Sequence, residues 1–192
     1  MRKVIYSSMV SLDGFVKDQN RNLDWIRIDE ELHTFVNEQH HEIDTFLFGR
    51  RMYEVMVSWE TIGHDASQPE YILEFARIWQ NIHKIVFSTT LDHVEGDATL
   101  NRGNIVDEIA RLKTLPGKDM SVGGATLAAI LIQSGLIDEY QLFINPVILG
   151  SGTPIFHALD HQTNIRLIET KTFSSGVVFL RYQPAGKASQ EK

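Results

Sequence analysis

The sequence predicts a single α/β domain in which helices flank a mostly parallel central sheet and antiparallel strands form its C-terminal edge. Through the first three quarters of the chain, short β-rich runs alternate with helical patterns, which is the order of strand–helix–strand crossovers. From Ile137 onward, strand-like runs follow one another without long helices between them. With 192 residues, of which 43% are hydrophobic, the chain is long enough to bury one core.

The parallel part is predicted from apolar strand-like runs and the helices between them. Strands are expected over residues 4–9, 43–48, 84–87 and 120–122. Helices are expected over residues 29–40 and 69–79, from residue 105 to the Pro116-Gly117 stop, and after the glycines at 123–124. In the helix over 69–79, the spacing predicts that Tyr71, Ile72, Phe75 and Ile78 face the core.

The antiparallel edge is predicted from three strand-like runs, over residues 140–144, 165–173 and 177–182, the last two joined by a Ser-Ser-Gly turn. The residues that follow are small and polar without an apolar anchor. We therefore expect one domain over residues 1–183 and a disordered tail over residues 184–192.

Composition narrows the classes of function. The chain has 0 Cys, which excludes disulfides, thiolate metal sites and cysteine nucleophiles and favours a cytoplasmic location. Its 18 Lys and Arg against 25 Asp and Glu give a net charge of −7, and no basic run suggests nucleic-acid binding. No apolar run approaches a membrane span or a signal peptide. The His residues at 33, 40 and 41 lack metal-site spacing, so we expect no metal and a small-molecule partner.

Three polar or glycine-rich turns, each directly after a predicted buried strand, are the candidate ligand site. In an open α/β sheet such turns meet at the carboxyl edge, where ligands bind. Glycines allow close approach to a pyrophosphate, arginines supply charge, and hydroxyls can donate to a phosphate. Each turn also has an ordinary structural interpretation, and neither G-x-G-x-x-G nor a P-loop is present. The residues are Gly49, Arg50 and Arg51; Ser88, Thr89 and Thr90; and Gly123, Gly124, Ala125 and Thr126.

Five motifs in order resemble one family. They are SSMVSLDG at 7–14, DTFLFGRRMYE at 44–54, IVFSTT at 85–90, SVGGATL at 121–127, and LIDEY followed by PVILGSGTPIF at 136–156. Together they resemble the dihydrofolate-reductase superfamily, in the branch similar to the C-terminal reductase domain of the bifunctional riboflavin-biosynthesis deaminase-reductase. The resemblance covers nearly the whole chain up to about Gln183.

The resemblance implies an NADPH-binding fold and hydride transfer to a C=N or C=O bond of a small heterocyclic substrate, pyrimidine-like or pterin-like, or of a carbonyl compound. It places Arg50 and Arg51 with Ser88 and Thr89 near the adenosine phosphates, and the glycines at 123–124 at the pyrophosphate. We expect a preference for NADPH over NADH, and loss of cofactor binding without unfolding when Gly124 becomes Val. The alternative is a non-catalytic nucleotide-binding or regulatory protein that keeps the cofactor cradle.

On the substrate side, Asp13 is the candidate catalytic residue because it follows the first strand, although an Asp-Gly pair often caps only its own turn. Trp25, Asp29, Glu30 and Glu54 are candidate substrate-binding residues. The alternative for Trp25, which the general excess of buried aromatic residues favours, is a core or pocket-wall aromatic. Glu54 is equally consistent with an ion pair to the arginine one helical turn before it.

The apolar run at 177–180 suggests a homodimer. Consecutive apolar residues in an edge strand require cover on both faces, which either a second subunit or helices of the same chain could provide. Relatives in the reductase branch are commonly dimers, so the resemblance favours the second subunit. The run is Val177, Val178, Phe179 and Leu180.

Overall fold

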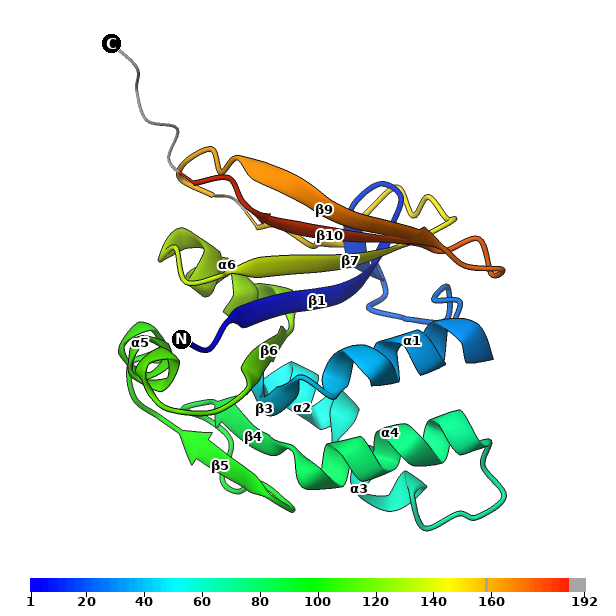
Figure 1. Ribbon diagram of the computed structural model, residues 1–192, viewed down its shortest axis with the longest axis horizontal. Helices are drawn as coiled ribbons and strands as arrows, with labels where there is room; N and C mark the ends of the chain where they lie inside the picture. Colours follow the sequence, from blue (N-terminus) through cyan, green and yellow to red (C-terminus); the bar gives the residue numbers. More distant parts are fainter. Residues whose placement is uncertain (158, 187–192) are drawn as a thin grey trace.

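The computed structural model, described here for residues 1–157 and 159–186, contains one eight-stranded sheet in the order β5-β4-β3-β6-β1-β7-β10-β9 (Figure 1). The strands are β1 (Val4–Ser11), β3 (Ile43–Gly49), β4 (His83–Phe87), β5 (Ala98–Asn101), β6 (Asp119–Gly123), β7 (Glu139–Asn145), β9 (Ile165–Thr172) and β10 (Val178–Pro184). A separate pair is formed by β2 (Phe15–Asp18) and β8 (Gly152–Pro154).

The strand directions confirm the predicted mostly parallel α/β sheet with antiparallel edge strands. Strands β5, β4, β3, β6, β1 and β7 pair in parallel, whereas β10 is antiparallel to both β7 and β9. The run at 140–144 was expected to belong to the antiparallel edge. It is antiparallel to its neighbour β10, but its other neighbour, β1, pairs with it in parallel. It lies in β7, which is parallel to β1 from Ile5↔Glu139 to Ser11↔Asn145.

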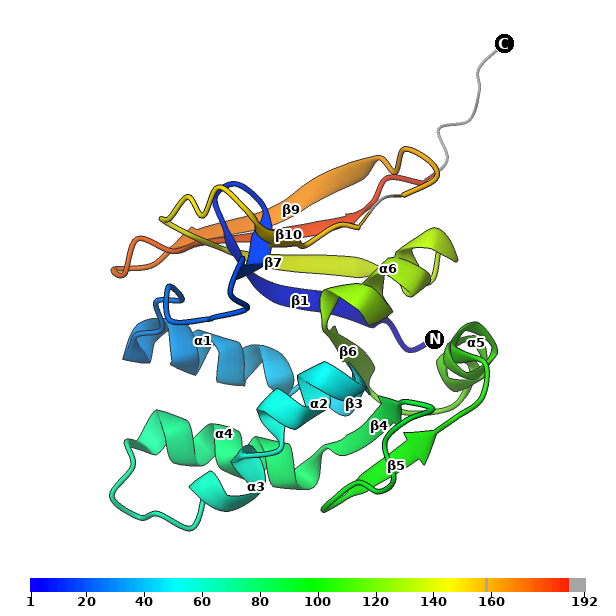
Figure 2. The ribbon, with the colours of Figure 1, turned by 180° about the vertical axis from the view of Figure 1, so that it is seen from behind.

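Helices cover both faces of the sheet (Figures 1 and 2). Helices α5 (Ile105–Thr114) and α6 (Ala125–Gln133) pack on the face that carries Val4 and Tyr6. The opposite face is covered by α1 (Glu30–His40), α2 (Arg50–Met56) and α4 (Glu70–Asn81), with the short α3 (Trp59–Ile62) beside α4. The alternation of Val4, Ile5 and Tyr6 between the two cores follows from the period of two along a strand.

Helix α4 shows where periodicity was misleading. Its buried residues are Phe75, Ala76 and Trp79, so of the four expected core residues only Phe75 is fully buried. The reason is that α4 packs against α1 as well as against the sheet. Trp79 stacks on Phe46 with ring centroids 5.9 Å apart, whereas Tyr71 faces α1, where its ring lies 5.2 Å from that of His33.

At the C-terminal end, β10 continues to Pro184, opposite Ile165, so the first residue of the expected tail is part of the sheet. Residues 187–192 of that tail lie outside the described residues. The apolar run is largely covered within the chain, because Val177 and Phe179 are fully buried against α1. No helix among residues 1–157 and 159–186 is long and apolar enough to cross a membrane.

Candidate active site

The three predicted turns lie side by side at the carboxyl edge of the sheet. They follow β4, β3 and β6, which are neighbours in the sheet, and the register places Gly49 opposite Phe87 and Phe48 opposite Gly123. A hydrogen bond joins two of the turns directly, since Nη1 of Arg50 donates to Oγ1 of Thr90 over 3.1 Å. The sheet therefore brings together residues that are 38 to 75 positions apart in the sequence.

Arg50 and Arg51 open α2 directly after β3. Nε of Arg50 donates to Oε1 of Glu54, one helical turn later, over 2.7 Å. This ion pair is the structural interpretation of Glu54 that the sequence left open, and it orients the Arg50 guanidinium along the edge. Arg51 is exposed and has no hydrogen-bond or ion-pair partner among the residues that the structure describes.

Ser88 organises the second turn. Its Oγ accepts hydrogen bonds from the backbone N–H groups of Thr90, over 3.2 Å, and Leu91, over 3.0 Å. Such a side-chain cap stabilises the turn and leaves Thr89 and Thr90 exposed. The hydroxyl-rich turn is thus held in one conformation at the end of β4.

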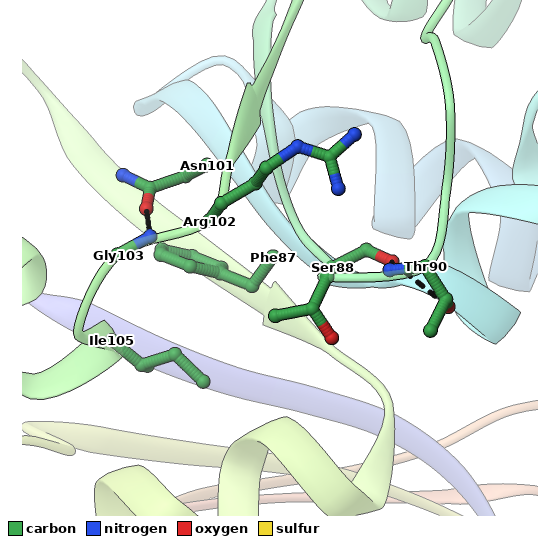
Figure 3. A pocket seen from close by; sticks show the side chains of 8 residues that line it. Phe87, Ser88, Thr90, Asn101, Arg102, Gly103 and Ile105 are labelled. Atoms are coloured by element: carbon green, nitrogen blue, oxygen red, sulfur yellow. Dashed lines mark hydrogen bonds between the residues drawn. The ribbon is translucent and has the colours of Figure 1, made fainter.

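A cleft of about 290 Å³ lies between this turn and the end of β5 (Figure 3). Its second wall contains Asn101 and Arg102, which were not among the predicted site residues. Nη2 of Arg102 donates to the carbonyl of Leu91 over 2.6 Å, and Oδ1 of Asn101 accepts from the N–H of Gly103 over 2.8 Å. The missed signal was a fourth polar turn between a strand and a helix, after a β5 of only 4 residues. The lining residues are Phe87, Ser88, Thr89, Thr90, Asn101, Arg102, Gly103 and Ile105.

Gly49, in the turn after β3, and Gly123 and Gly124, in the turn after β6, differ in the space that each leaves for a side chain. A Cβ at Gly49 would meet nothing within 4 Å, so this backbone is open to a ligand. A Cβ at Gly123 would lie 2.7 Å from the Phe48 ring, which gives this glycine a packing role. Gly124 has a φ of +98° and would place its Cβ 3.3 Å from Cβ of Met52. A branched residue is strained there, so Gly124→Val, which was expected to spare folding, is now expected to lower stability as well as cofactor binding.

Ala125 and Thr126 begin α6 directly after these glycines. The first backbone bond of the helix runs from the N–H of Ala128 to the carbonyl of Gly124. The amides of residues 125–127 precede that bond and belong to the helix N-terminus, which favours an anion. Ala125 is buried and Thr126 is exposed, so the hydroxyl of Thr126 faces solvent.

Asp13 lies farther along the same edge, after β1. Its carboxylate accepts hydrogen bonds from the Ser11 hydroxyl over 2.7 Å, from the N–H of Leu149 over 3.1 Å and from the N–H of Gly150 over 2.7 Å. Burial opposes ionisation, but these hydrogen bonds outweigh it and lower the pKa of Asp13 below its ordinary value. Asp13 is therefore an anion at neutral pH.

The structure does not gather the other expected substrate-side residues around Asp13. Asp29 caps α1 by accepting from the N–H of Leu32 over 2.9 Å, which lowers its pKa, and it also accepts from the Ser174 hydroxyl. The N–H of Ser174 likewise lowers the pKa of Glu31, so both acids attach α1 to the turn between β9 and β10. Sequence spacing alone could not reveal this contact because Ser174 is more than 140 residues away.

Glu30 and Trp25 lie in different surroundings. Glu30 lines a shallow cleft along α1, together with Glu31, Thr34, Phe35, Glu38 and Lys171. Trp25, which is partly exposed, lies between β2 and α1 and donates its indole N–H to the carbonyl of Asn22 over 3.2 Å. Within the described residues, no group of three or more His, Cys, Asp or Glu is arranged to hold a metal ion.

Known structures share this fold. The fold matches that of a putative riboflavin biosynthesis protein from Shewanella sp. PV-4, with a TM-score of 0.76 and 22% identity, over 96% of this chain and 99% of that one. It also matches dihydrofolate reductase from Enterococcus faecalis complexed with NADP(H), with a TM-score of 0.64 and 14% identity, over 95% of this chain and 96% of that one. The protein is thus an α/β protein of the dihydrofolate-reductase-like fold.

Sequence comparison places it more narrowly. The model of the RibD C-terminal domain matches residues 2–179, and the chain belongs to that family. It is 35% identical over 187 residues to the uncharacterized protein YyaP of Bacillus subtilis (strain 168), which covers 94% of both chains. The resemblance found in the sequence motifs is confirmed.

Proposed function

We propose that the protein is an NADPH-dependent reductase that transfers a hydride to a C=N or C=O bond of a small heterocyclic substrate, pyrimidine-like or pterin-like, or of a carbonyl compound. The observation that carries this proposal is the cationic, glycine-lined edge where the turns after β3, β4 and β6 meet, next to the cleft at β5. A relative of the same fold is complexed with NADP(H) at 14% identity, which supports the choice of cofactor.

The residues at this edge fit a phosphorylated dinucleotide in chemistry and in space. Arg50 and Arg102 stand on the side of the cleft, where they would pair with the 2′-phosphate and neighbouring phosphates of the adenosine half. Gly49 leaves its backbone open, and the amides at the start of α6 suit the pyrophosphate. The nicotinamide half would then extend past the turn of β6 toward β1.

When bound, NADPH supplies the hydride. The chain's own residues would hold the cofactor along the edge and orient one face of the ring toward the acceptor. Arg51 and Thr89, both exposed, remain available for phosphate contacts, and Glu54 acts on the cofactor side by orienting Arg50.

Two measurements test the function. Calorimetry should show tighter binding of NADPH than of NADH, and equal affinities would contradict the phosphate-binding role of these turns. NADPH oxidation should then be screened against pterins, pyrimidines and quinones. Tight NADPH binding with no oxidation in any of these classes would favour the alternative, a nucleotide-binding or regulatory protein without a productive substrate site.

We further propose that the protein acts in the cytoplasm as a homodimer. The chain has 0 Cys, which supports a location in a reducing compartment such as the cytoplasm. The dimer is supported by apolar side chains on the edge strand β9, where Ile165, Leu167 and Ile168 are 40%, 49% and 42% exposed. We call these three residues the β9 patch.

A further inference from the structure

We propose that Asp13 is a positioning residue, which attaches the turn at 146–150 to the end of β1 and so fixes one wall of the candidate active site. That this wall borders a substrate rests on the proposed function. The attachment of the turn by Asp13 does not depend on that function.

The two segments are neighbours because β1 and β7 run in parallel and end together, at Ser11↔Asn145. Beyond that pair, the N–H of Leu12 donates to the carbonyl of Val147 over 2.8 Å. The Asp13 carboxylate then receives the N–H groups of Leu149 and Gly150. Beyond the end of the sheet, one backbone hydrogen bond therefore still joins the two segments. After it, the Asp13 carboxylate accepts the hydrogen bonds that a backbone carbonyl would accept within a sheet.

The backbone on both sides is shaped for this contact. Gly14, after the aspartate, has a φ of +88°, and Gly150 has a φ of +76°, values that favour glycine. The Ser11 hydroxyl donates to Asp13, while its oxygen accepts from the N–H of Phe15 over 2.9 Å. Two consecutive N–H groups and a hydroxyl thus donate to one carboxylate. Its negative charge stabilises the turn by accepting these hydrogen bonds.

The same hydrogen bonds argue against a proton-donating role. An ionised carboxylate only accepts hydrogen bonds, and three donors within 3.1 Å stabilise that form. Asp13 has no proton to transfer while this arrangement persists. The turn that carries Asp13 follows β1, the strand next to β6 and its Gly123-Gly124 turn, and the attached turn at 146–150 follows β7, one strand farther from the cleft at β5.

A second side chain joins the other end of the segment between β1 and α1 to β7. Oδ1 of Asn145, a fully buried residue at the end of β7, accepts from the N–H of Arg27 over 2.8 Å. Both ends of the segment between β1 and α1 are thereby joined to β7 or to the turn that follows it. Removing Asp13 should free one of these two attachments and leave the other in place.

Hydrogen exchange on the full chain tests the attachment directly. In Asp13→Ala, the amides of Leu149 and Gly150 should exchange about tenfold faster or more, because the charged acceptor is gone. Asp13→Asn, which keeps one carbonyl acceptor, should give an intermediate rate. Asp65→Asn is the matched control, since Asp65 accepts hydrogen bonds from Ser67 and Gln68 in a loop elsewhere, and it should leave residues 147–152 unchanged. Unchanged exchange in Asp13→Ala would overturn the inference.

Kinetics with NADPH and menadione separate positioning from proton donation. Asp13→Asn should raise KM for menadione more than it lowers kcat, keep the shape of the pH profile and leave the NADPH dissociation constant unchanged. Loss of one limb of the pH profile in Asp13→Asn, with unchanged exchange at 149–150, would assign proton transfer to Asp13 and overturn the inference.

The two proposals fail in different ways. If the wild-type protein oxidises no NADPH with any acceptor, the proposed reductase function fails, while the exchange measurement still decides the role of Asp13. If Asp13→Ala does not fold, the isosteric Asp13→Asn and a Ser11→Ala variant, which removes one donor, carry the same comparison.

Discussion

At the scale of single residues, the charge of Arg50 is the feature most directly coupled to the proposed cofactor. Its guanidinium is held by Glu54 and Thr90, and its side chain is 47% exposed. Glu54 uses Nε and Thr90 uses Nη1, so the Nη2 group remains for a phosphate. A half-exposed arginine that is already oriented should contribute at the lower end of the range for charge-assisted hydrogen bonds.

We expect Arg50→Ala to weaken NADPH binding about tenfold, or ~1.5 kcal/mol, with little effect on NADH. Titration calorimetry of both cofactors measures this difference. Arg111→Ala is the matched control, because Arg111 is also exposed and paired with a carboxylate one helical turn away, Glu108, on α5. An equal loss of NADPH and NADH affinity in Arg50→Ala would show that this residue supports the turn rather than the 2′-phosphate.

The glycines give a second prediction at this scale. Gly124→Ala should lower the free energy of unfolding by about 1–2 kcal/mol, because φ is +98° and Met52 is close. Gly49→Ala should cost at most about 1 kcal/mol, since φ is −81° and the space is open, yet it should weaken NADPH binding. Denaturant unfolding and titration on both variants check the pair. If Gly49→Ala binds NADPH like the wild type, the cofactor does not approach this backbone.

Residue types predicted where the three turns of the candidate site lie. The turns at 49–51, 88–90 and 123–126 could be found because each follows an apolar run, and parallel strands place such turns at one edge. The contacts of Asp29 with Ser174 and of Asp13 with Leu149 could not be found. They join segments more than 130 residues apart, and a side chain's partner across the fold leaves no local pattern.

At the scale of elements, periodicity predicted the long helices and the central strands but not the short ones. Helices α2 and α3 have 7 and 4 residues, and strands β2, β5 and β8 have at most 4, which is too short for a period to be visible. The face of α4 was partly wrong for a different reason. A helix that packs against both a sheet and another helix has two apolar stripes, and a single-stripe pattern cannot separate them.

Two histidines of α1 that pack against β3 and α4 should make the free energy of unfolding depend on pH. His40 packs edge-on against Phe46 and Phe75, with ring centroids 5.2 and 5.5 Å away, and burial lowers its pKa to about 4. Burial among Trp59, Tyr71 and Phe75 lowers the pKa of His33 in the same direction. In the unfolded chain both residues take up a proton near pH 6.5.

Stability should therefore fall as the pH decreases from about 6.5 to about 4, because the unfolded state binds protons that the folded state excludes. For His40 the loss is of the order of 3 kcal/mol across that interval. Unfolding of the wild type and of His40→Leu at pH 7 and pH 4.5 measures it, and the variant should lose less. His93→Leu, at an exposed position, is the control. Equal losses in the wild type and His40→Leu would contradict the assignment.

At the scale of the whole molecule, the two faces of β9 differ. Glu169 lies opposite Arg181 and forms an ion pair with it at 3.2 Å, while Lys171 lies over the ring of Phe35, so charged residues occupy the side facing α1. Leu167 lies opposite Tyr182, and Ile168 is the additional residue at the β-bulge. A bulge discourages a second strand from pairing along the edge, which makes packing through the apolar face the favoured contact.

The occupant of this face should be a second copy of the chain. A two-fold axis would place each patch against the identical one, as in most homodimers. Packing of one sheet face on another then buries apolar side chains from both copies.

We expect light scattering at micromolar concentration to give twice the 21.9 kDa of one chain. Leu167→Asp should shift the mass toward one chain without unfolding it, because the side chain is already 49% exposed in the single chain. Phe179→Asp is unsuitable for this test, since Phe179 is fully buried between Phe35 and Phe143. Leu115→Asp is the matched control, an exposed apolar residue beyond the end of α5. A mass of 21.9 kDa for the wild type, or a Leu167→Asp variant that keeps the doubled mass, would exclude a dimer through the β9 patch.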